Sequence, residues 1–255
     1  MINPKKKFGQ NFLTDENIAK EIVSYLDDTD SKLIMEIGPG KGILTKYILE
    51  IGNKEKKFIE IDEECVKYLN DKFIGIKNDL INSNFLQINL KQFRKPISVI
   101  GNFPYNISSQ ILFKIYDNKS VVNEMVGMFQ LEVAERICSN FGTKKYGILS
   151  VLIQAFFTVK MMKKINRKSF FPTPNVESAV IKITKKTDKI NCNEMLFKKV
   201  VKQSFGQRRK TLRNSLKIFN IPDIKKEDTI FAKRPEQLNV SDFIYLTNLV
   251  GNENI

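Results

Sequence analysis

The 255-residue chain contains no histidine and only three cysteines. Without histidine, a mechanism that uses an imidazole base is excluded, and so is a metal site with histidine ligands. Cys65, Cys138 and Cys192 lie far apart, so they match neither a disulfide framework nor the close spacing of metal-binding cysteines. These absences predict a cytoplasmic protein that binds no metal.

Long apolar runs are also missing from the chain. No run approaches the roughly 18 apolar residues that a membrane-spanning helix needs. The basic segment Met1–Lys7 is not followed by the apolar stretch of a signal peptide. We therefore expect no membrane partner. Hydrophobic residues still make up 42% of the chain, enough for a sizeable core in one large domain or in a main domain with a small appendix.

Acidic residues are scarce in one part of the chain. Residues 156–217 hold 17 Lys and Arg but only 3 Asp and Glu, whereas the remainder holds 25 of each, so this region carries the whole net charge of +14. Gln207–Arg213 is its densest stretch. Such a region can be a solubilising surface, but its concentration favours a polyanionic partner, nucleic acid before membrane. Binding to phosphates would weaken as salt rises.

Apolar segments of strand length alternate with helical patterns over most of the chain. Strands are expected at Leu33–Ile37, Lys57–Asp62, Ile97–Gly101, Glu124–Gln130, Phe157–Ile165 and Val176–Ile183. This alternation predicts an α/β fold with a parallel-type sheet and helices on both faces.

A polar stretch, Lys186–Asn191, interrupts this pattern. Beyond it the strand patterns stop, and amphipathic helices are expected around Phe197–Phe205, around Leu212–Phe219 and after Ser241. We therefore predict an α/β domain at residues 1–187 and a small all-helical domain at residues 188–255.

A glycine turn, Gly38–Gly42, directly follows the first of these strands and precedes a helical pattern. Strand, glycine turn and helix form the layout of a nucleotide-binding site, because glycines let the backbone approach a ligand closely. The spacing G-x-G-x-G disfavours a dinucleotide enzyme without excluding it. Glu60 follows Gly40 by twenty residues at the end of the next strand, where an acid suits the hydroxyls of a ribose. The alternative for Glu60 is a solvent-facing strand end.

A third polar strand end, Asn102–Tyr105, follows Ile97–Gly101. The side-chain oxygen of Asn102 and the carbonyl of Phe103 can both accept hydrogen bonds from one exocyclic NH₂ group. Pro104 stiffens the loop, and Tyr105 can stack on a planar base. The alternative is a strand that ends in a proline turn beside a core tyrosine.

Five blocks of the sequence resemble the family of ribosomal RNA adenine N6-dimethyltransferases, and within it the small-subunit branch. The blocks are Lys7–Leu13, Glu36–Gly42, Asn102–Tyr105, Phe171–Val180 and Phe205–Leu216. The resemblance implies a Rossmann-like class I methyltransferase domain, a small helical C-terminal domain and S-adenosylmethionine as methyl donor. It also implies dimethylation of two adjacent adenosines near the 3′ end of small-subunit rRNA, coupled to biogenesis of that subunit.

The resemblance also assigns a donor site. By position, its residues would be Asn11, Leu13, Gly38, Gly40, Glu60, Asn84 and Asn102. Two positions depart from the family. Phe103 replaces an aliphatic residue but keeps its carbonyl. Asn84 replaces an Asp that, in the family, accepts a hydrogen bond from the adenine amino group of the donor. An Asn can still accept through its oxygen, but without the help of a charge. We therefore expect weaker donor binding.

The resemblance implies a mechanism that needs no strong base. The lone pair of adenine N6 is delocalised into the ring, and hydrogen bonds from its NH₂ to Asn102 and to the Phe103 carbonyl would localise it. This agrees with the absence of histidine. Asn102, Phe103, Pro104 and Tyr105 are the expected catalytic residues, with Tyr105 stacking on the flipped target base.

The expected partner is small-subunit rRNA in an immature small ribosomal subunit, bound by a monomer. The predicted phosphate contacts are Lys5, Lys6, Lys7, Arg208, Arg209, Lys210 and Arg213. Three alternatives remain open: a large-subunit rRNA dimethyltransferase of the kind that confers macrolide resistance, a non-catalytic assembly factor, and a DNA adenine methyltransferase. The short C-terminal segment argues against the last, which usually needs a larger sequence-reading domain.

Overall fold

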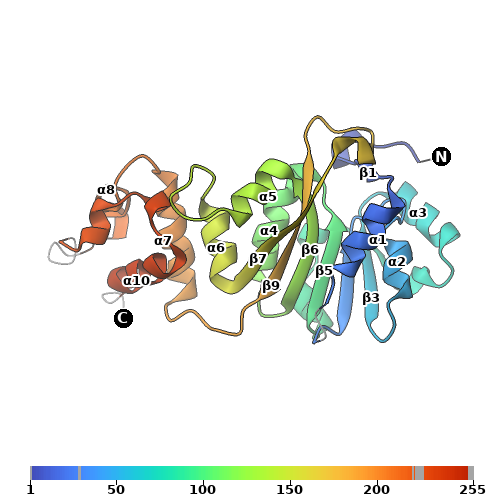
Figure 1. Cartoon of the computed structure of the whole chain (residues 1–255). Helices are drawn as coiled ribbons and strands as arrows, with labels where there is room; N and C mark the ends of the chain where they lie inside the picture. Colours follow the sequence, from blue (N-terminus) through green and yellow to red (C-terminus); the bar gives the residue numbers. More distant parts are fainter. Residues whose placement is uncertain (1, 28–29, 220, 222–226, 252–255) are drawn as a thin grey trace. The chain divides into compact units, whose positions relative to one another are not determined.

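The computed structural model describes residues 2–27, 30–219, 221 and 227–251 (Figure 1). The chain divides into two compact units, one made of residues 1–134 and 159–185 and the other of residues 135–158 and 186–255. Within the described residues, no helix is both long enough and apolar enough to cross a membrane.

A seven-stranded sheet forms the centre of the first unit. Its strands, in spatial order, are β4 (Leu80–Asn82), β3 (Glu55–Glu60), β2 (Leu33–Ile37), β5 (Ile97–Asn102), β6 (Val122–Gln130), β9 (Ser178–Lys185) and β7 (Phe157–Ile165). Strands β2 to β6 pair in parallel, and β9 pairs antiparallel with β6. The predicted α/β fold with a parallel-type sheet is confirmed, with one antiparallel strand added.

Helices cover both faces of this sheet. They are α1 (Glu16–Ser24), α2 (Thr45–Glu50), α3 (Glu63–Lys72) and α4 (Ser108–Asp117), followed by α5 (Leu131–Cys138), which begins in this unit. Figure 1 shows α1 and α2 in front of the strands and α4 behind them. The sequence defines the start of α1, because the carboxylate of Asp15 accepts hydrogen bonds from the amides of Asn17 and Ile18 at 2.9 and 3.1 Å.

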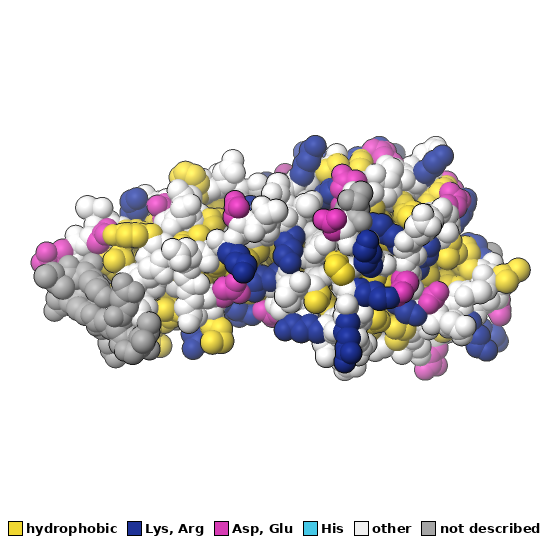
Figure 2. All heavy atoms as spheres, turned by 90° about the horizontal axis from the view of Figure 1, so that it is seen from below, with side chains coloured by type: hydrophobic (Ala, Val, Ile, Leu, Met, Phe, Trp, Pro, Cys, Tyr) yellow, Lys and Arg dark blue, Asp and Glu magenta, His cyan; other side chains and the backbone are white. Residues whose placement is uncertain are grey.

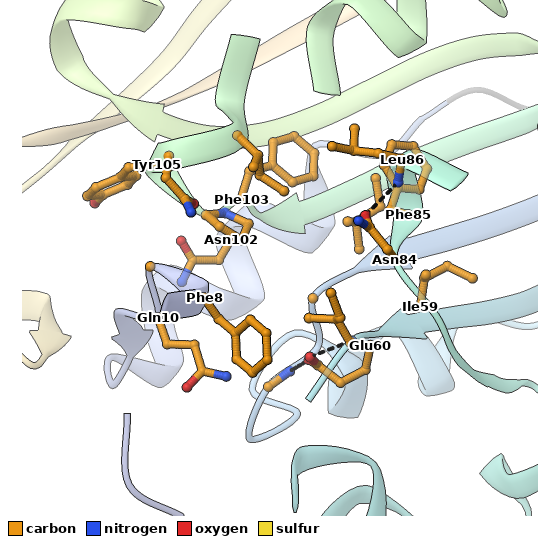
Figure 3. Close-up of a pocket in the computed structure, with 18 of the residues that line it drawn as sticks. Phe8, Gln10, Ile59, Glu60, Asn84, Phe85, Leu86, Asn102, Phe103 and Tyr105 are labelled. Atoms are coloured by element: carbon orange, nitrogen blue, oxygen red, sulfur yellow. Dashed lines mark hydrogen bonds between the residues drawn. The ribbon is translucent and has the colours of Figure 1, made fainter. Parts of the chain in front are cut away.

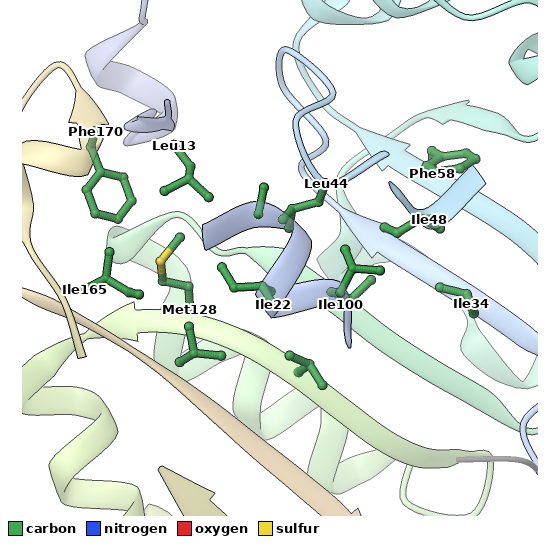
Figure 4. Close-up of a cluster of buried hydrophobic side chains, with 14 of the residues drawn as sticks. Leu13, Ile22, Ile34, Leu44, Ile48, Phe58, Ile100, Met128, Ile165 and Phe170 are labelled. Atoms are coloured by element: carbon green, nitrogen blue, oxygen red, sulfur yellow. The ribbon is translucent and has the colours of Figure 1, made fainter. Parts of the chain in front are cut away.

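A hydrophobic cluster packs α1 and α2 onto the sheet (Figure 4). Ile22 of α1 and Ile48 of α2 are fully buried on strand residues such as Ile100. The cluster extends to Leu13 and Phe170, which face each other in a two-stranded sheet of β1 (Phe12–Leu13) and β8 (Phe170–Phe171). Burying a leucine or phenylalanine side chain stabilises a fold by about 1.5–3 kcal/mol. This small sheet therefore fixes the end of the N-terminal arm, residues 5–13, to the core.

Apart from the start of β7, the regular structure in the described part of the second unit is helical. Its helices are the end of α5, α6 (Ile148–Phe156), α7 (Glu194–Gly206), α8 (Leu212–Ser215) and α10 (Val240–Gly251). Phe197 of α7 packs edge-on against Phe156 of α6 at 6.4 Å between ring centres, and Phe205 stacks on Phe243 of α10 at 5.8 Å.

The division between the units differs from the sequence-based boundary. The second unit resumes at Lys186, close to the predicted break after residue 187, but it also takes in residues 135–158. The reason is that α6 packs against α7, a contact between segments far apart in the chain. The assignment of separate roles to residues 1–187 and 188–255 stays a prediction.

Candidate active site

A cavity of about 300 Å³ lies where β2, β3, β4 and β5 end (Figure 3). Gly38 and Gly40 line it after β2, Glu60 at the end of β3, Asn84 after β4, and Asn102–Tyr105 at β5. The arm contributes residues 7–12. The carboxyl edge of a parallel sheet is where ligands bind in α/β proteins.

The structure therefore gathers almost all of the predicted donor-site residues around one cavity. Leu13 is the exception, because it is not among the described lining residues. Its side chain is 4% exposed and belongs to the hydrophobic cluster. Any contact between Leu13 and a ligand is left to its backbone.

The glycine turn has a backbone that side chains would strain. Gly38 and Gly40 have φ values of 67° and 57°, in the left-handed region that favours glycine. At Gly40 a Cβ atom would also lie 2.8 Å from the ring of Phe12 in the arm. The turn and the arm can approach each other this closely only because position 40 has no side chain.

Glu60 holds this turn from the neighbouring strand. Its Oε2 accepts a hydrogen bond from the amide of Gly40, and its Oε1 accepts from the amides of Ile61 and Asp62, all at 2.9 Å. Burial raises the pKa of Glu60, and the three backbone hydrogen bonds oppose that rise. The residue is 4% exposed, so the alternative of a solvent-facing strand end is wrong.

Asn102 has a fixed orientation. Its Nδ2 donates a hydrogen bond to the carbonyl oxygen of Asn11 at 2.7 Å. A carbonyl can only accept, so the amide nitrogen is the atom that faces Asn11 and Oδ1 is the atom left for a ligand. The half-buried side chain therefore offers an acceptor to the cavity, as the sequence predicted.

Phe103 lines the cavity, but its side chain is 1% exposed. The ring packs against Phe129 of β6 at 5.1 Å between ring centres. A Cβ on Gly127 would lie 2.3 Å from this ring, so the glycine in β6 makes the space for it. The sheet thus accommodates the bulky ring at position 103. The role of its backbone carbonyl as an acceptor stays a prediction.

Tyr105 is held by a residue that the sequence did not indicate. Its hydroxyl shares a 2.6 Å hydrogen bond with Oγ of Ser178, which is fully buried at the start of β9. Burial raises the pKa of Tyr105, and the hydrogen bond with Ser178 partly opposes that rise. The tether fixes the ring, which lines the cavity.

The arm is clamped onto Asp62, a second residue that sequence reasoning missed. The carboxylate of Asp62 accepts hydrogen bonds from Nζ of Lys5 at 2.6 Å and from Nε2 of Gln10 at 2.9 Å. Burial acts to raise the pKa of Asp62, but these hydrogen bonds outweigh it and lower the pKa. No local pattern signals the clamp, because its members lie more than fifty residues apart.

A family model described as "Ribosomal RNA adenine dimethylase" matches residues 1–239. The chain belongs to the ribosomal RNA adenine dimethylase family. It is 48% identical over 257 aligned residues to a "Ribosomal RNA small subunit methyltransferase A" from Flavobacterium johnsoniae, covering 100% of this chain and 98% of the relative. The same name is given to a relative from Parabacteroides distasonis, 48% identical over 97% of this chain and 94% of the relative.

Solved structures share the dimethylase fold. A dimethyladenosine transferase from Plasmodium falciparum superimposes with a TM-score of 0.81 at 24% identity, covering 94% of this chain and 98% of that one. The 23S rRNA methyltransferase ErmE gives a TM-score of 0.69 at 22% identity, covering 93% and 100%. At these identities the likeness concerns the fold, and the chain is a class I methyltransferase in architecture.

Basic residues that we predict to bind RNA are exposed in both units of this dimethylase: Lys6 and Lys7 in the arm, and Arg209 and Lys210 in the second unit. Lys7 also lines the cavity. Arg213 is exposed as well. Figure 2 shows Lys and Arg side chains at the surface, with acidic side chains among them.

Two other predicted RNA contacts have partners within the dimethylase itself. Lys5 pairs with Asp62 and with Glu64, whose Oε1 lies 2.9 Å from its ammonium, and these hydrogen bonds raise the pKa of Lys5. Arg208 donates to the carbonyl of Thr143 at 3.2 Å and faces Glu236 at 3.8 Å. RNA contacts by these two residues stay predictions.

Across the residues that the structure describes, no cluster of three or more Cys, Asp and Glu side chains is arranged to hold a metal ion.

Proposed function

We propose that the protein transfers methyl groups from S-adenosylmethionine to N6 of two adjacent adenosines near the 3′ end of small-subunit rRNA, giving N6,N6-dimethyladenosine. The observation that carries the proposal is the fixed amide of Asn102, which leaves Oδ1 free beside the Phe103 carbonyl in the cavity. The names of relatives 48% identical over almost the whole chain favour the small-subunit acceptor.

The cavity fits the methyl donor along the edge of the sheet. The strand order is β4-β3-β2-β5, so the residues that line the cavity follow one another along the sheet edge in that order. Asn84, Phe85 and Leu86 at the β4 end suit a planar base. Glu60 suits a ribose hydroxyl, because Oε2 accepts only one hydrogen bond, from Gly40, and can accept another. The volume of about 300 Å³ lies at the lower end of the range for small-molecule sites.

The glycine turn and Asn102 lie at the other end, where the reacting groups would meet. The donor supplies a methyl group on a sulfonium, which is a good leaving group. The protein's task is then to align N6 with that methyl group. Oδ1 of Asn102 and the carbonyl of Phe103 accept hydrogen bonds from the N6 amino group, which localises the lone pair on nitrogen. As the bond from N6 to the methyl carbon forms, the bond from that carbon to sulfur breaks. The cationic N6 then loses a proton to water, so no side chain needs to act as a strong base.

The acceptor base must leave its stack to reach this cavity. The ring of Tyr105, fixed by Ser178, would stack on it. Lys6, Lys7, Arg209, Lys210 and Arg213 would contact the RNA backbone, with residues 1–187 as the catalytic domain and residues 188–255 as an RNA-binding domain. We propose that the protein acts as a monomer in the cytoplasm on the immature small subunit.

The proposal is tested by transfer of labelled methyl groups to small ribosomal subunits that lack these modifications, with large subunits and duplex DNA in parallel. Label in small-subunit RNA alone supports the proposal. Label in the large subunit or in DNA would assign the protein to another branch of adenine methyltransferases. Tight particle binding with no label anywhere would make it an assembly factor.

A further inference from the structure

At the β4 end of the cavity, the amide oxygen of Asn84 is held by the backbone, and the side-chain NH₂ group is the part left without a partner. Its Oδ1 accepts a hydrogen bond from the backbone amide of Leu86 at 2.9 Å (Figure 3). A backbone N–H can only donate, so the atom that faces it must be the amide oxygen. The orientation of the Asn84 side chain therefore follows from its partner.

The turn that holds this amide is fixed from both sides. The amide of Gln87 donates to the carbonyl oxygen of Asn84 at 2.9 Å. Nζ of Lys114, from α4, donates to the carbonyl oxygen of Leu86 at 2.8 Å and lies 5.4 Å from the centre of the Phe85 ring. Reversing the Asn84 amide would place its NH₂ against the Leu86 amide, which is two donors facing each other.

Nδ2 is then the polar atom that Asn84 has left. In the described part of the chain, no oxygen accepts a hydrogen bond from it, and the residue lines the cavity. Ile61, Phe85 and Leu86 line the same end and offer apolar side chains. In apolar surroundings, a hydrogen bond from the NH₂ group makes a large difference to the affinity for a ligand.

We infer that Asn84 relaxes the choice of base at this end of the cavity, so that a purine with an acceptor at its 6-position, such as a carbonyl oxygen, binds at least as tightly as adenine. The inference rests on the proposed function, in which the donor's base occupies this end. It sharpens the expectation from the sequence, because the oxygen that was to accept from the amino group is directed at the backbone amide of Leu86. A carboxylate at position 84 would keep one oxygen for Leu86 and turn the other toward an amino group.

The test compares the binding of two ligands by calorimetry. S-adenosylhomocysteine carries an amino group at the 6-position, and S-inosylhomocysteine carries an oxygen there. The wild-type protein should bind the inosyl compound at least as tightly as the adenosyl compound. In Asn84→Asp, the ratio of the two Kd values should shift toward the adenosyl compound by about tenfold or more, the effect of a hydrogen bond to a charged group.

Two further variants make the comparison specific. Asn78→Asp makes the same charge change at an exposed position outside the cavity lining and should leave the ratio unchanged. Asn84→Ala removes the donor, and should weaken binding of the inosyl compound more than that of the adenosyl compound.

A ratio that stays within about threefold in Asn84→Asp, with both ligands bound, overturns the inference and leaves the proposed function intact. If wild-type protein and every variant bind neither ligand, the proposed function itself fails, because the cavity then takes no nucleoside thioether.

Discussion

Nδ2 of Asn102 donates a hydrogen bond to the main-chain carbonyl oxygen of Asn11 at 2.7 Å, although the two residues are 91 positions apart. The bond determines which end of the Asn102 amide faces the cavity. The N-terminal arm is therefore part of the device that orients the amide. The clamp at Asp62 holds the arm, and the arm holds the amide of Asn102.

Removing this amide should abolish most of the methyl transfer. We expect Asn102→Ala to lower kcat by about 10²–10³, the usual effect of losing one pre-organised hydrogen-bonding group. Affinity for RNA should stay within about twofold, because the amide contacts the reacting base and not the backbone. Single-turnover kinetics and filter binding measure the two quantities. Asn17→Ala, at an exposed position of α1, is the control. A large loss of RNA affinity in Asn102→Ala would mean that its role is misassigned.

The clamp should be needed for donor binding. Asp62→Asn keeps an oxygen for the amide of Glu64 at the start of α3 but removes the charge that holds Lys5. We expect the KM for S-adenosylmethionine to rise about tenfold, and hydrogen exchange to become faster in residues 5–11. Glu64→Gln removes only the exposed partner of Lys5 and should change KM less than twofold. Equal effects of the two substitutions would contradict a role for Asp62 in holding the arm.

Tyr105 should act through its ring. Tyr105→Phe loses the bond to Ser178, which stabilises the fold by about 1 kcal/mol, and should keep kcat within about threefold. Tyr105→Ala also loses stacking on the base, worth about 1–3 kcal/mol, so kcat/KM for RNA should fall by about 10–100-fold. If the Phe variant were as impaired as the Ala variant, the hydroxyl would have a direct role in the reaction.

Glu36 should make stability fall as pH rises. Burial raises the pKa of Glu36 from 4.5 to about 8. The charge of Glu60 adds to this rise in pKa, and a hydrogen bond from Thr45 at 2.6 Å opposes the rise. Between these two pH values the folded state holds a proton that the unfolded state releases. The free energy of unfolding should therefore decrease with pH by about 1.4 kcal/mol per unit from this residue.

Denaturant unfolding between pH 5 and 8 measures this contribution. Glu36→Gln keeps an oxygen for Thr45 and removes the titration, so its stability should depend less steeply on pH and exceed that of the wild-type protein near pH 8. Parallel curves for the two proteins would show that Glu36 does not titrate as its burial indicates.

Arg209 should contribute a phosphate contact. It is exposed, and Arg209→Ala should weaken RNA binding and reduce the slope of log K against log salt by roughly one. Lys77→Ala is the matched control, because this exposed lysine precedes β4 at the strand end opposite to the cavity. An unchanged slope in the Arg209 variant would remove that residue from the RNA surface.

The strand ends of the site were predictable because the signals are local. Glycines at 38 and 40, an acid at 60 and the Asn102–Tyr105 loop each follow an apolar strand, and parallel strands bring such ends to one edge. The two-residue β1 and β8 and the three-residue β4 were not predicted, since segments so short show no periodicity.

The contacts that orient the site residues could not be predicted in this way. Asn102 with Asn11, Tyr105 with Ser178 and Asp62 with Lys5 are separated by 91, 73 and 57 positions. Polar pairs at such distances have no periodicity, and they form only once the tertiary fold brings them together. The same holds for α6, whose packing on α7 depends on contacts that lie outside its own segment.

We propose above that this protein dimethylates adenosine in small-subunit rRNA and that Asn102 orients the reacting amino group. The most direct measurement is nucleoside analysis of unmethylated small subunits after incubation with S-adenosylmethionine and either wild-type protein or Asn102→Ala. We expect N6,N6-dimethyladenosine in RNA treated with the wild-type protein, and almost none in RNA treated with the variant at equal RNA binding. Dimethyladenosine formed equally by both proteins would contradict this proposal.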